Sequence, residues 1–319
     1  MYATMEKKGK LIAVWGDAIG VGAVSTTAAL TAAGLATREK NTLILSTDRG
    51  PFDGVSISSD LAVENLMDDL VILASSGGIR SEEDFTPYVQ KLSDYLSCLK
   101  GTNEFSKISV SAAEAIHRIL DMALYIYDFV VVDVHGERAA ISDRIIQDAD
   151  LVLFCISQNR KHMARLVSDS IFTSYLEEKT AMLVVTKYQI YDFLTLKHME
   201  KLLGTSGFYT LSDDDEIHKA VCAQNVADYV FRNINGASKG LIIKKKLEPS
   251  VTMDELNVIL NDILELFKEE EEKPKFFFSR KKEPDPEPEP EPEPAEEDPV
   301  PPEDRPEPPA IKKPKAKED

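Results

Sequence analysis

The residues best suited to chemistry lie near the start of the chain, in the segment WGDAIGVGAVSTTAAL at positions 15–30. An apolar run at 11–15, a glycine-bearing loop and an alanine-rich helical segment follow one another there. Such an arrangement binds phosphates, because bare backbone N–H groups and the positive end of the helix face the anion. A working loop reads G-x-x-x-x-G-K-[ST], in which the lysine contacts the phosphates and the hydroxyl binds Mg²⁺. Residues 16–27 contain no lysine or arginine, so the sequence predicts a phosphate-loop position without its usual cation.

This loop resembles the deviant Walker A loop of the ParA/MinD family of SIMIBI P-loop proteins, S-G-K-G-G-V-G-K-T-T. Laid on it without gaps, residues 16–25 read G-D-A-I-G-V-G-A-V-S. Both family lysines are replaced, by Ala18 and Ala23, so the Walker A loop is degenerate. Val24 stands at the position of the Mg²⁺-binding hydroxyl, and a shift by one residue offers Ser25 but restores no lysine. The positions that match the family are Gly20, Val21 and Gly22.

Further segments resemble the family in order and spacing. Residues 41–48 (NTLILSTD) are similar to its second strand, which ends in D-x-D; Ser46 replaces the first acid and Asp48 keeps the second. Residues 127–136 (YDFVVVDVHG) resemble the Walker B strand and place Asp133 at the Mg²⁺-directed carboxylate. Residues 149–157 (ADLVLFCIS) resemble the next strand of the family. Residues 183–187 (LVVTK) fall where the family often has an asparagine that reads the base, and this sequence has Thr186 and Lys187 there.

The resemblance implies a nucleotide site, in which Asp133 would bind Mg²⁺ only together with the nucleotide. Asp48 and Asp133 are the candidate catalytic residues, and the alternative for both is that they cap helices or loops. Phosphoryl transfer depends on positive charge placed around the phosphates, so the loss of both lysines predicts little or no ATP hydrolysis. We expect no bound cofactor; ATP with Mg²⁺ is the alternative. The candidate nucleotide-binding residues are Gly20, Val21, Gly22, Ala23, Ser25 and Thr26.

Within the family, the CpaE/TadZ-like members are associated with pili and secretion and often have atypical Walker A loops. The V-W-G at 14–16 also looks similar to a set of Gram-positive proteins encoded with secretion or conjugation ATPases. The resemblance therefore implies a localisation or assembly scaffold for a pilus or secretion machine of the Tad, type II or type IV kind. Its partners would be the secretion or pilus ATPase, assembly proteins and, as a further possibility, a second copy of the chain.

The alternative is a divergent but active ATPase of the same family, which receives a cationic group in trans. Such an ATPase would cycle between monomer and dimer to position cargo. In the family the first lysine, here Ala18, reaches the nucleotide of the partner subunit. A homodimer of this chain would therefore need an interface that does not depend on nucleotide.

The elements that must position these residues are short apolar runs separated by segments with helical spacing. Strands that are apolar on both faces and alternate with helices predict an α/β fold, with a doubly wound, mostly parallel sheet. We expect this P-loop-like domain to occupy residues 1–245. The runs lie at 11–15, 43–45, 70–74, 129–132, 151–156 and 182–185, and helical segments at 111–127 and 162–176.

A separate amphipathic helix is predicted within 246–268, because residues 253–267 place apolar side chains at i, i+3 and i+4 spacing. It packs on its own domain or, alternatively, on a partner. Its polar face is acidic, which argues against direct membrane insertion. Residues 269–319 hold 14 of the 17 prolines and predict a disordered acidic tail. Within that tail we expect Phe276, Phe277 and Phe278 to dock on a partner, because three adjacent phenylalanines are costly to expose.

The chain has 319 residues and a formal net charge of −18, which argues against nucleic acid as a partner and against an anionic membrane as a partner. Cys98, Cys155 and Cys222 are isolated, so neither a disulfide framework nor a cysteine-based zinc site is predicted. The apolar run at 11–15 is too short for a signal peptide or a membrane span. A cytoplasmic protein is therefore expected, recruited to a membrane machine only through its partners.

Overall fold

The computed structural model describes residues 8–16, 23–47, 66–99, 110–134, 140–168, 172, 180–234 and 250–272. The chain divides into two units, Met1–Lys273 and Pro274–Asp319, and all described residues belong to the first. The predicted acidic tail from 273 onward and its three phenylalanines therefore lie outside the described residues.

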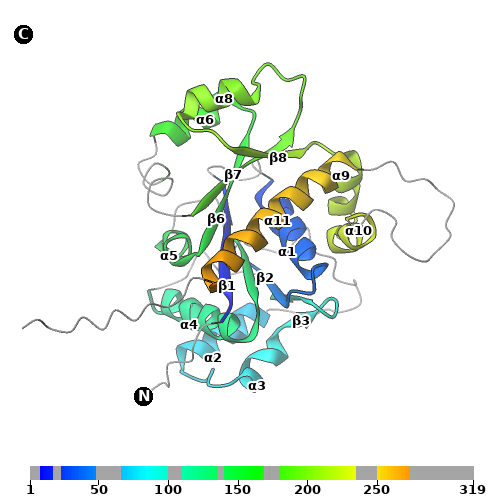
Figure 1. Ribbon diagram of the computed structural model, residues 1–319. Helices are drawn as coiled ribbons and strands as arrows, with labels where there is room; N and C mark the ends of the chain where they lie inside the picture. The colour runs from blue at the N-terminus through cyan, green and yellow to red at the C-terminus, as the bar shows by residue number, and fades with distance from the viewer. Residues whose placement is uncertain are drawn as a thin grey trace, which may run out of the picture. The chain divides into compact units, whose positions relative to one another are not determined.

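Strands within the described residues form one sheet in the order β3-β4-β2-β5-β1-β6-β7-β8 (Figure 1). Every neighbouring pair is parallel except β3 with β4. This arrangement confirms the predicted α/β fold with a mostly parallel sheet. The strands are β1 (Lys10–Trp15), β2 (Thr42–Ser46), β3 (Gln90–Lys91), β4 (Leu96–Leu99), β5 (Phe129–Asp133), β6 (Leu151–Ser157), β7 (Ala181–Tyr188) and β8 (Phe208–Ser212).

Helices cover both faces of the sheet (Figure 1). One face packs against α2 (Leu66–Ser75), α4 (Val110–Ile126) and α5 (Ala140–Asp148). The same face also packs against the short helices α6 (Arg160–Ser168) and α8 (Leu196–Leu203). The other face packs against α1 (Val24–Ala36), α9 (Asp215–Cys222), α10 (Val226–Asn233) and α11 (Val251–Glu272). The one-turn helix α3 (Glu82–Phe85) and a 3-10 turn, Thr86–Tyr88, precede β3.

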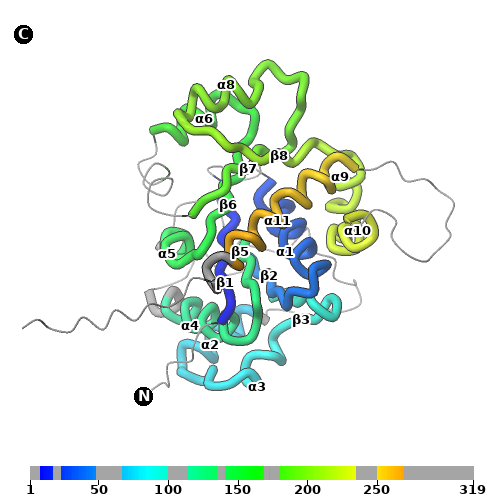
Figure 2. Tube along the Cα trace, in the orientation of Figure 1, coloured from blue at the N-terminus to red at the C-terminus, as the bar shows by residue number. Residues whose placement is uncertain are grey.

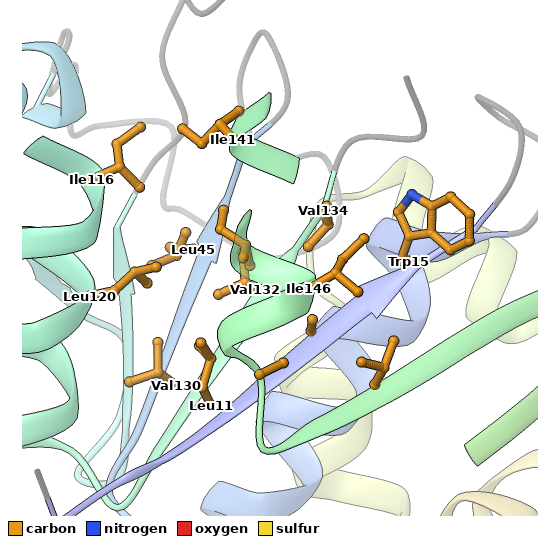
Figure 3. Packing of buried hydrophobic residues seen from close by; sticks show 14 of the residues in the cluster. Leu11, Trp15, Leu45, Ile116, Leu120, Val130, Val132, Val134, Ile141 and Ile146 are labelled. Carbon is orange, nitrogen blue, oxygen red and sulfur yellow. The ribbon is translucent and has the colours of Figure 1, made fainter. Parts of the chain in front are cut away.

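The central strand β1 shows why a parallel strand must be apolar on both sides. Successive side chains of a strand point to opposite faces. Leu11, Ala13 and Trp15 accordingly lie in the core under α2, α4 and α5, where Figure 3 shows Leu11 and Trp15. Ile12 and Val14 lie in the core under α1 and α11. Two cores are thus built from one uninterrupted apolar run.

The C-terminal helix α11 lies beside α1 across one face of the sheet (Figure 2). Gly34 of α1 makes room for it, because a Cβ at this position would stand 2.4 Å from Cδ1 of Leu260. At its other flank, Glu255 accepts hydrogen bonds from the Thr210 hydroxyl at 2.5 Å and the Ser212 backbone at 2.6 Å. The apolar face of the helix is therefore buried in its own domain, and the helix runs to Glu272, beyond the expected end at 268.

The prediction of a strand at 70–74 is wrong, because these residues belong to helix α2. Met67, Leu70 and Ala74 are buried, at helical spacings of three and four residues, whereas Ile72 is 69% exposed. The apolar run LVILA concealed this periodicity, since the exposed side of the helix is apolar as well.

None of the described helices combines the length and the apolarity that a membrane-spanning segment requires.

Candidate functional site

The candidate site lies where the carboxyl ends of β1, β2, β5 and β6 meet. Parallel register brings residues together there that are far apart in the sequence: Val14 pairs with Asp133, and so does Ser46 from the opposite side. Trp15 is opposite Phe154 of β6. In open α/β sheets this edge is the usual place for a ligand.

Asp133, the predicted metal-directed carboxylate, is only 4% exposed. Its Oδ2 accepts a hydrogen bond from the hydroxyl of Ser46 over 3.1 Å. Thr47 donates two hydrogen bonds to the backbone carbonyl of Asp133. The Thr47 N–H donates over 2.9 Å and the Thr47 hydroxyl over 3.2 Å. Ser46 thus contributes a neutral donor to the carboxylate, and Thr47 binds the backbone carbonyl of the same residue.

The start of α1 is closed on its sheet side by an apolar contact. A Cβ placed on Gly16 would stand 2.9 Å from Cγ2 of Val24 and 3.2 Å from the carbonyl oxygen of Cys155. Gly16 is therefore required by close approach, because any side chain would displace one of these neighbours. Val24, which the gap-free alignment puts at the family's Mg²⁺-binding hydroxyl, packs on the end of β1.

The first turn of α1 presents backbone groups rather than charged side chains. Ala23 is its N-cap residue and adopts the left-handed conformation, with φ 46° and ψ 38°. It makes no side-chain capping hydrogen bond, and the first turn contains no acidic residue. The hydroxyl of Thr27 donates back to the Ala23 carbonyl over 3.0 Å. Ser25 and Thr26 are half-buried in the same turn.

Cys155 lies beneath this turn and is buried. The pKa of its thiol is raised to about 12, chiefly by burial; a hydrogen bond with Thr27 opposes this shift, and the nearby charge of Asp133 adds to it. The thiol is therefore neutral at physiological pH, which makes it a packing residue and not a nucleophile or a metal ligand.

The single tryptophan closes the end of β1. Trp15 is 3% exposed, and its ring meets that of Phe154 edge-on, with centroids 5.5 Å apart. Its indole Nε1 is buried and has no hydrogen-bond partner among the residues that the structure describes. Figure 3 shows the ring at the tip of the strand, beyond the aliphatic side chains of the core. Trp15 directly precedes Gly16 and the loop that leads to α1, so its fluorescence can report on ligand binding to that loop, although its ring lies on the opposite face of the sheet from α1.

The side chains of this site do not fit a Mg²⁺-nucleotide in the manner of a G-K-[ST] loop. Val24 offers no oxygen to a metal, and residues 16–27 provide no cation for the phosphates. Lys187 lies near the end of β7, which is separated from β1 by β6, so its backbone is at least two strand spacings, about 10 Å, from β1. What remains suited to an anion is the backbone at the start of α1.

The structure thus brings together Ala23, Ser25 and Thr26 on one turn, with Asp133 on the neighbouring strand end. Gly20, Val21, Gly22 and Asp48 lie outside the described residues. Sequence reasoning overlooked the contributions of Thr47 and Cys155. Both positions follow from parallel register, since each is at or next to the end of a strand adjacent to β5 or β1.

The sequence matches no family model and no curated protein. Solved structures do match in fold. A ParA family ATPase from Chlorobium tepidum TLS is 15% identical with a TM-score of 0.60, and the match covers 79% of this chain and 99% of that one.

Two MinD structures give similar values. The cell division ATPase MinD of Pyrococcus furiosus is 14% identical, with a TM-score of 0.58 and coverage of 81% of this chain and 99% of that one. The MinC:MinD cell division protein complex of Aquifex aeolicus contains a chain that is 13% identical, also with a TM-score of 0.58, covering 80% and 96%. The chain therefore has the fold of the ParA/MinD family ATPases.

Proposed function

We propose that this chain is a catalytically degenerate protein of ParA/MinD fold that serves as a localisation or assembly scaffold for a pilus or secretion machine. In this role it hydrolyses little or no ATP and acts by binding protein partners, among them the ATPase of that machine. The CpaE/TadZ-like members, with their atypical Walker A loops, provide the closest analogy.

One observation carries the proposal: the packing of Val24 on Gly16 at the start of α1. Phosphoryl transfer is catalysed almost entirely by positioned positive charge, namely a lysine and a metal ion at the β- and γ-phosphates. An apolar side chain at the metal position, with alanines at both lysine positions, removes these contributions together. The hydrogen bond from Ser46 to Asp133 supports the same conclusion, because it satisfies the remaining carboxylate from within the protein.

A role in protein assembly is supported by the comparison with MinD, which was solved in a complex with MinC. It is also supported by the V-W-G opening of the loop, a feature similar to proteins encoded with secretion or conjugation ATPases. Partner binding requires a folded surface but no turnover, so it survives the loss of the catalytic residues.

The second candidate is a divergent, active ATPase that completes its site in trans. The observation in its favour is the free first turn of α1, which has no side-chain cap and no acidic residue. Such a turn attracts anions through its backbone N–H groups. A cation from another subunit would then have to replace both missing lysines.

Nucleotide titration of the full chain, followed by Trp15 fluorescence and phosphate release, distinguishes these candidates. The scaffold proposal predicts no phosphate release at millimolar ATP and Mg²⁺, with or without a pilus or secretion ATPase from the same organism. It also predicts that the chain copurifies with that ATPase. Trp15→Phe is the control for the fluorescence signal. Saturable binding with phosphate release would refute the scaffold proposal and support the second candidate.

A further inference from the structure

The loop between β7 and α8, residues 189–195, exposes three large apolar side chains. Ile190 is 68% exposed, Tyr191 98% and Phe193 86%. Single exposed apolar residues are common on protein surfaces, but a contiguous group is typical of an interaction site. Because these side chains are so fully exposed, they project from the surface and do not line a groove.

The loop is held in place by Gln158, which precedes α6. The side-chain amide of Gln158 donates to the carbonyls of Gln189, over 3.1 Å, and of Leu194, over 3.0 Å. Its amide oxygen accepts the N–H of Gln189 over 2.7 Å. One side chain therefore clamps both ends of the loop. Because the loop is already ordered, its apolar tip loses little conformational entropy on binding.

Within the loop, the carboxylate of Asp192 accepts the N–H of Leu194 over 3.0 Å. The ring of Phe193 stacks on His198 of α8, with centroids 6.2 Å apart and an interplanar angle of 22°. These contacts fix the direction of the tip relative to α8.

Basic residues lie in the segments beside this tip. The segments 158–161 and 187–201 contain five lysines and arginines against two acids, Asp192 and Glu200, in a chain whose formal net charge is −18. A third acid, Asp213, also lies beside the loop, since its carboxylate accepts a hydrogen bond from the side chain of Gln189 over 3.1 Å. All five are exposed. Because Gln158 joins the start of α6 to the loop, bases from both helices lie next to the apolar tip. We call this surface the basic ring; it consists of Arg160, Lys161, Lys187, Lys197 and Lys201.

We propose that the 189–195 loop and the basic ring dock this protein on an anionic membrane surface. Tyrosine and phenylalanine favour the interfacial region of a bilayer, and lysine and arginine beside them contact lipid phosphates while their methylene stems stay with the apolar tip. Charge complementarity favours an anionic membrane, since the basic ring is positively charged on a chain that is acidic as a whole. A projecting tip also needs no matching cavity when it enters lipid.

The expectation against an anionic membrane rests on the net charge of the whole chain, and the expectation against direct membrane insertion rests on residues 253–267. The apolar face of that helix is occupied by its own domain. The loop is a different element with the opposite charge. Its side chains would enter only the interface, which does not require a membrane-spanning helix.

The test is cosedimentation of the full chain with vesicles of phosphatidylglycerol and phosphatidylcholine in equal amounts, compared with pure phosphatidylcholine. We expect binding to the anionic vesicles that weakens as salt is raised. The double change Tyr191→Ser and Phe193→Ser should lower the affinity by about 100-fold or more. Removing one charge, as in Lys197→Gln, should lower it about fivefold.

A matched control is available because Ile72 on α2 is 69% exposed, against 68% for Ile190. Ile190→Ser should weaken vesicle binding and Ile72→Ser should not, while both variants keep the thermal midpoint of the wild type. The proposal is overturned if the wild type does not pellet with anionic vesicles at low salt, or if the two isoleucine variants bind equally. Binding of single-stranded DNA by the same tip, without vesicle binding, would also overturn it.

Discussion

The hydroxyl of Ser46 lies 3.1 Å from Oδ2 of Asp133 and donates a hydrogen bond to it, inside the protein and across two adjacent parallel strands. The ParA/MinD resemblance places a second carboxylate at position 46. With serine there, the pair carries one negative charge in place of two, and a neutral donor takes the place of a second acid. A carboxylate arranged in this way is stabilised without a metal ion.

Replacing Ser46 with alanine should therefore destabilise the fold. The change leaves a buried carboxylate oxygen without this donor, which costs about 1–3 kcal/mol in the free energy of unfolding. Urea denaturation followed by circular dichroism measures it. Ser75→Ala is the control, because the hydroxyl of Ser75 donates to a carbonyl at an exposed position. Equal stability of the two variants would show that the Ser46 hydrogen bond contributes nothing to stability.

The contact between Gly16 and Val24 leads to a prediction about packing. Gly16→Ala should lower the free energy of unfolding by about 1–3 kcal/mol, because the new Cβ meets Cγ2 of Val24 at 2.9 Å. The double variant with Val24→Ala should recover part of this loss. Recovery will be partial, since the carbonyl oxygen of Cys155, 3.2 Å from the new Cβ, cannot be removed.

A double-mutant cycle at constant pH measures this coupling. The Val24→Ala single variant is the reference for the loss of the valine side chain alone. Additive effects of the two changes would contradict a direct contact between Gly16 and Val24.

Strands with uninterrupted apolar runs were predictable from the sequence, and β1, β2, β5, β6 and β7 contain the runs that were expected. Two other segments resisted prediction for physical reasons. Residues 70–74 form a helix whose exposed side is also apolar, so their period was hidden. Strand β8 reads FYTLS, and its polar residues are explained only by Glu255 of α11, which accepts hydrogen bonds from Thr210 and Ser212.

At the candidate site, the sequence located Asp133 and the start of α1, because each follows or precedes a clear element. It did not show that Ser46 satisfies Asp133, since this depends on the register between β2 and β5. Nor did it show that Val24 covers Gly16, which depends on how closely the start of α1 approaches the end of β1. The first contact joins residues 87 positions apart and the second depends on the path of the intervening loop, so local pattern predicts neither.

The three cysteines should differ sharply in reactivity. Cys98 and Cys155 are buried, and burial raises the pKa of the Cys155 thiol to about 12, whereas Cys222 is exposed on α9. Because the thiolate is the reactive form, a thiol reagent should modify one cysteine per chain under native conditions and three after denaturation. Cys222→Ser should abolish the native reaction. Native modification of Cys155 would contradict the closed packing around the start of α1.

Stability at high pH should depend on Tyr209, whose hydroxyl donates to the carboxylate of Asp262 over 2.7 Å. Burial and this hydrogen bond raise the pKa of Tyr209 to about 12, above its ordinary value of 10.0. Between pH 10 and about 12, the folded state binds more protons than the unfolded state, so the free energy of unfolding falls as pH rises. The stabilising contribution is therefore complete below pH 10 and is lost progressively up to about 12.

Urea midpoints of the wild type and Tyr209→Phe, measured between pH 8 and pH 12, test this relationship. At pH 8 the variant should be less stable, because the hydrogen bond between β8 and α11 is missing. The difference should shrink at higher pH, since the wild type alone loses this contribution. Tyr125→Phe is the control, as Tyr125 is exposed on α4. A constant difference across the range would mean that Asp262 does not hold the Tyr209 proton in the folded protein.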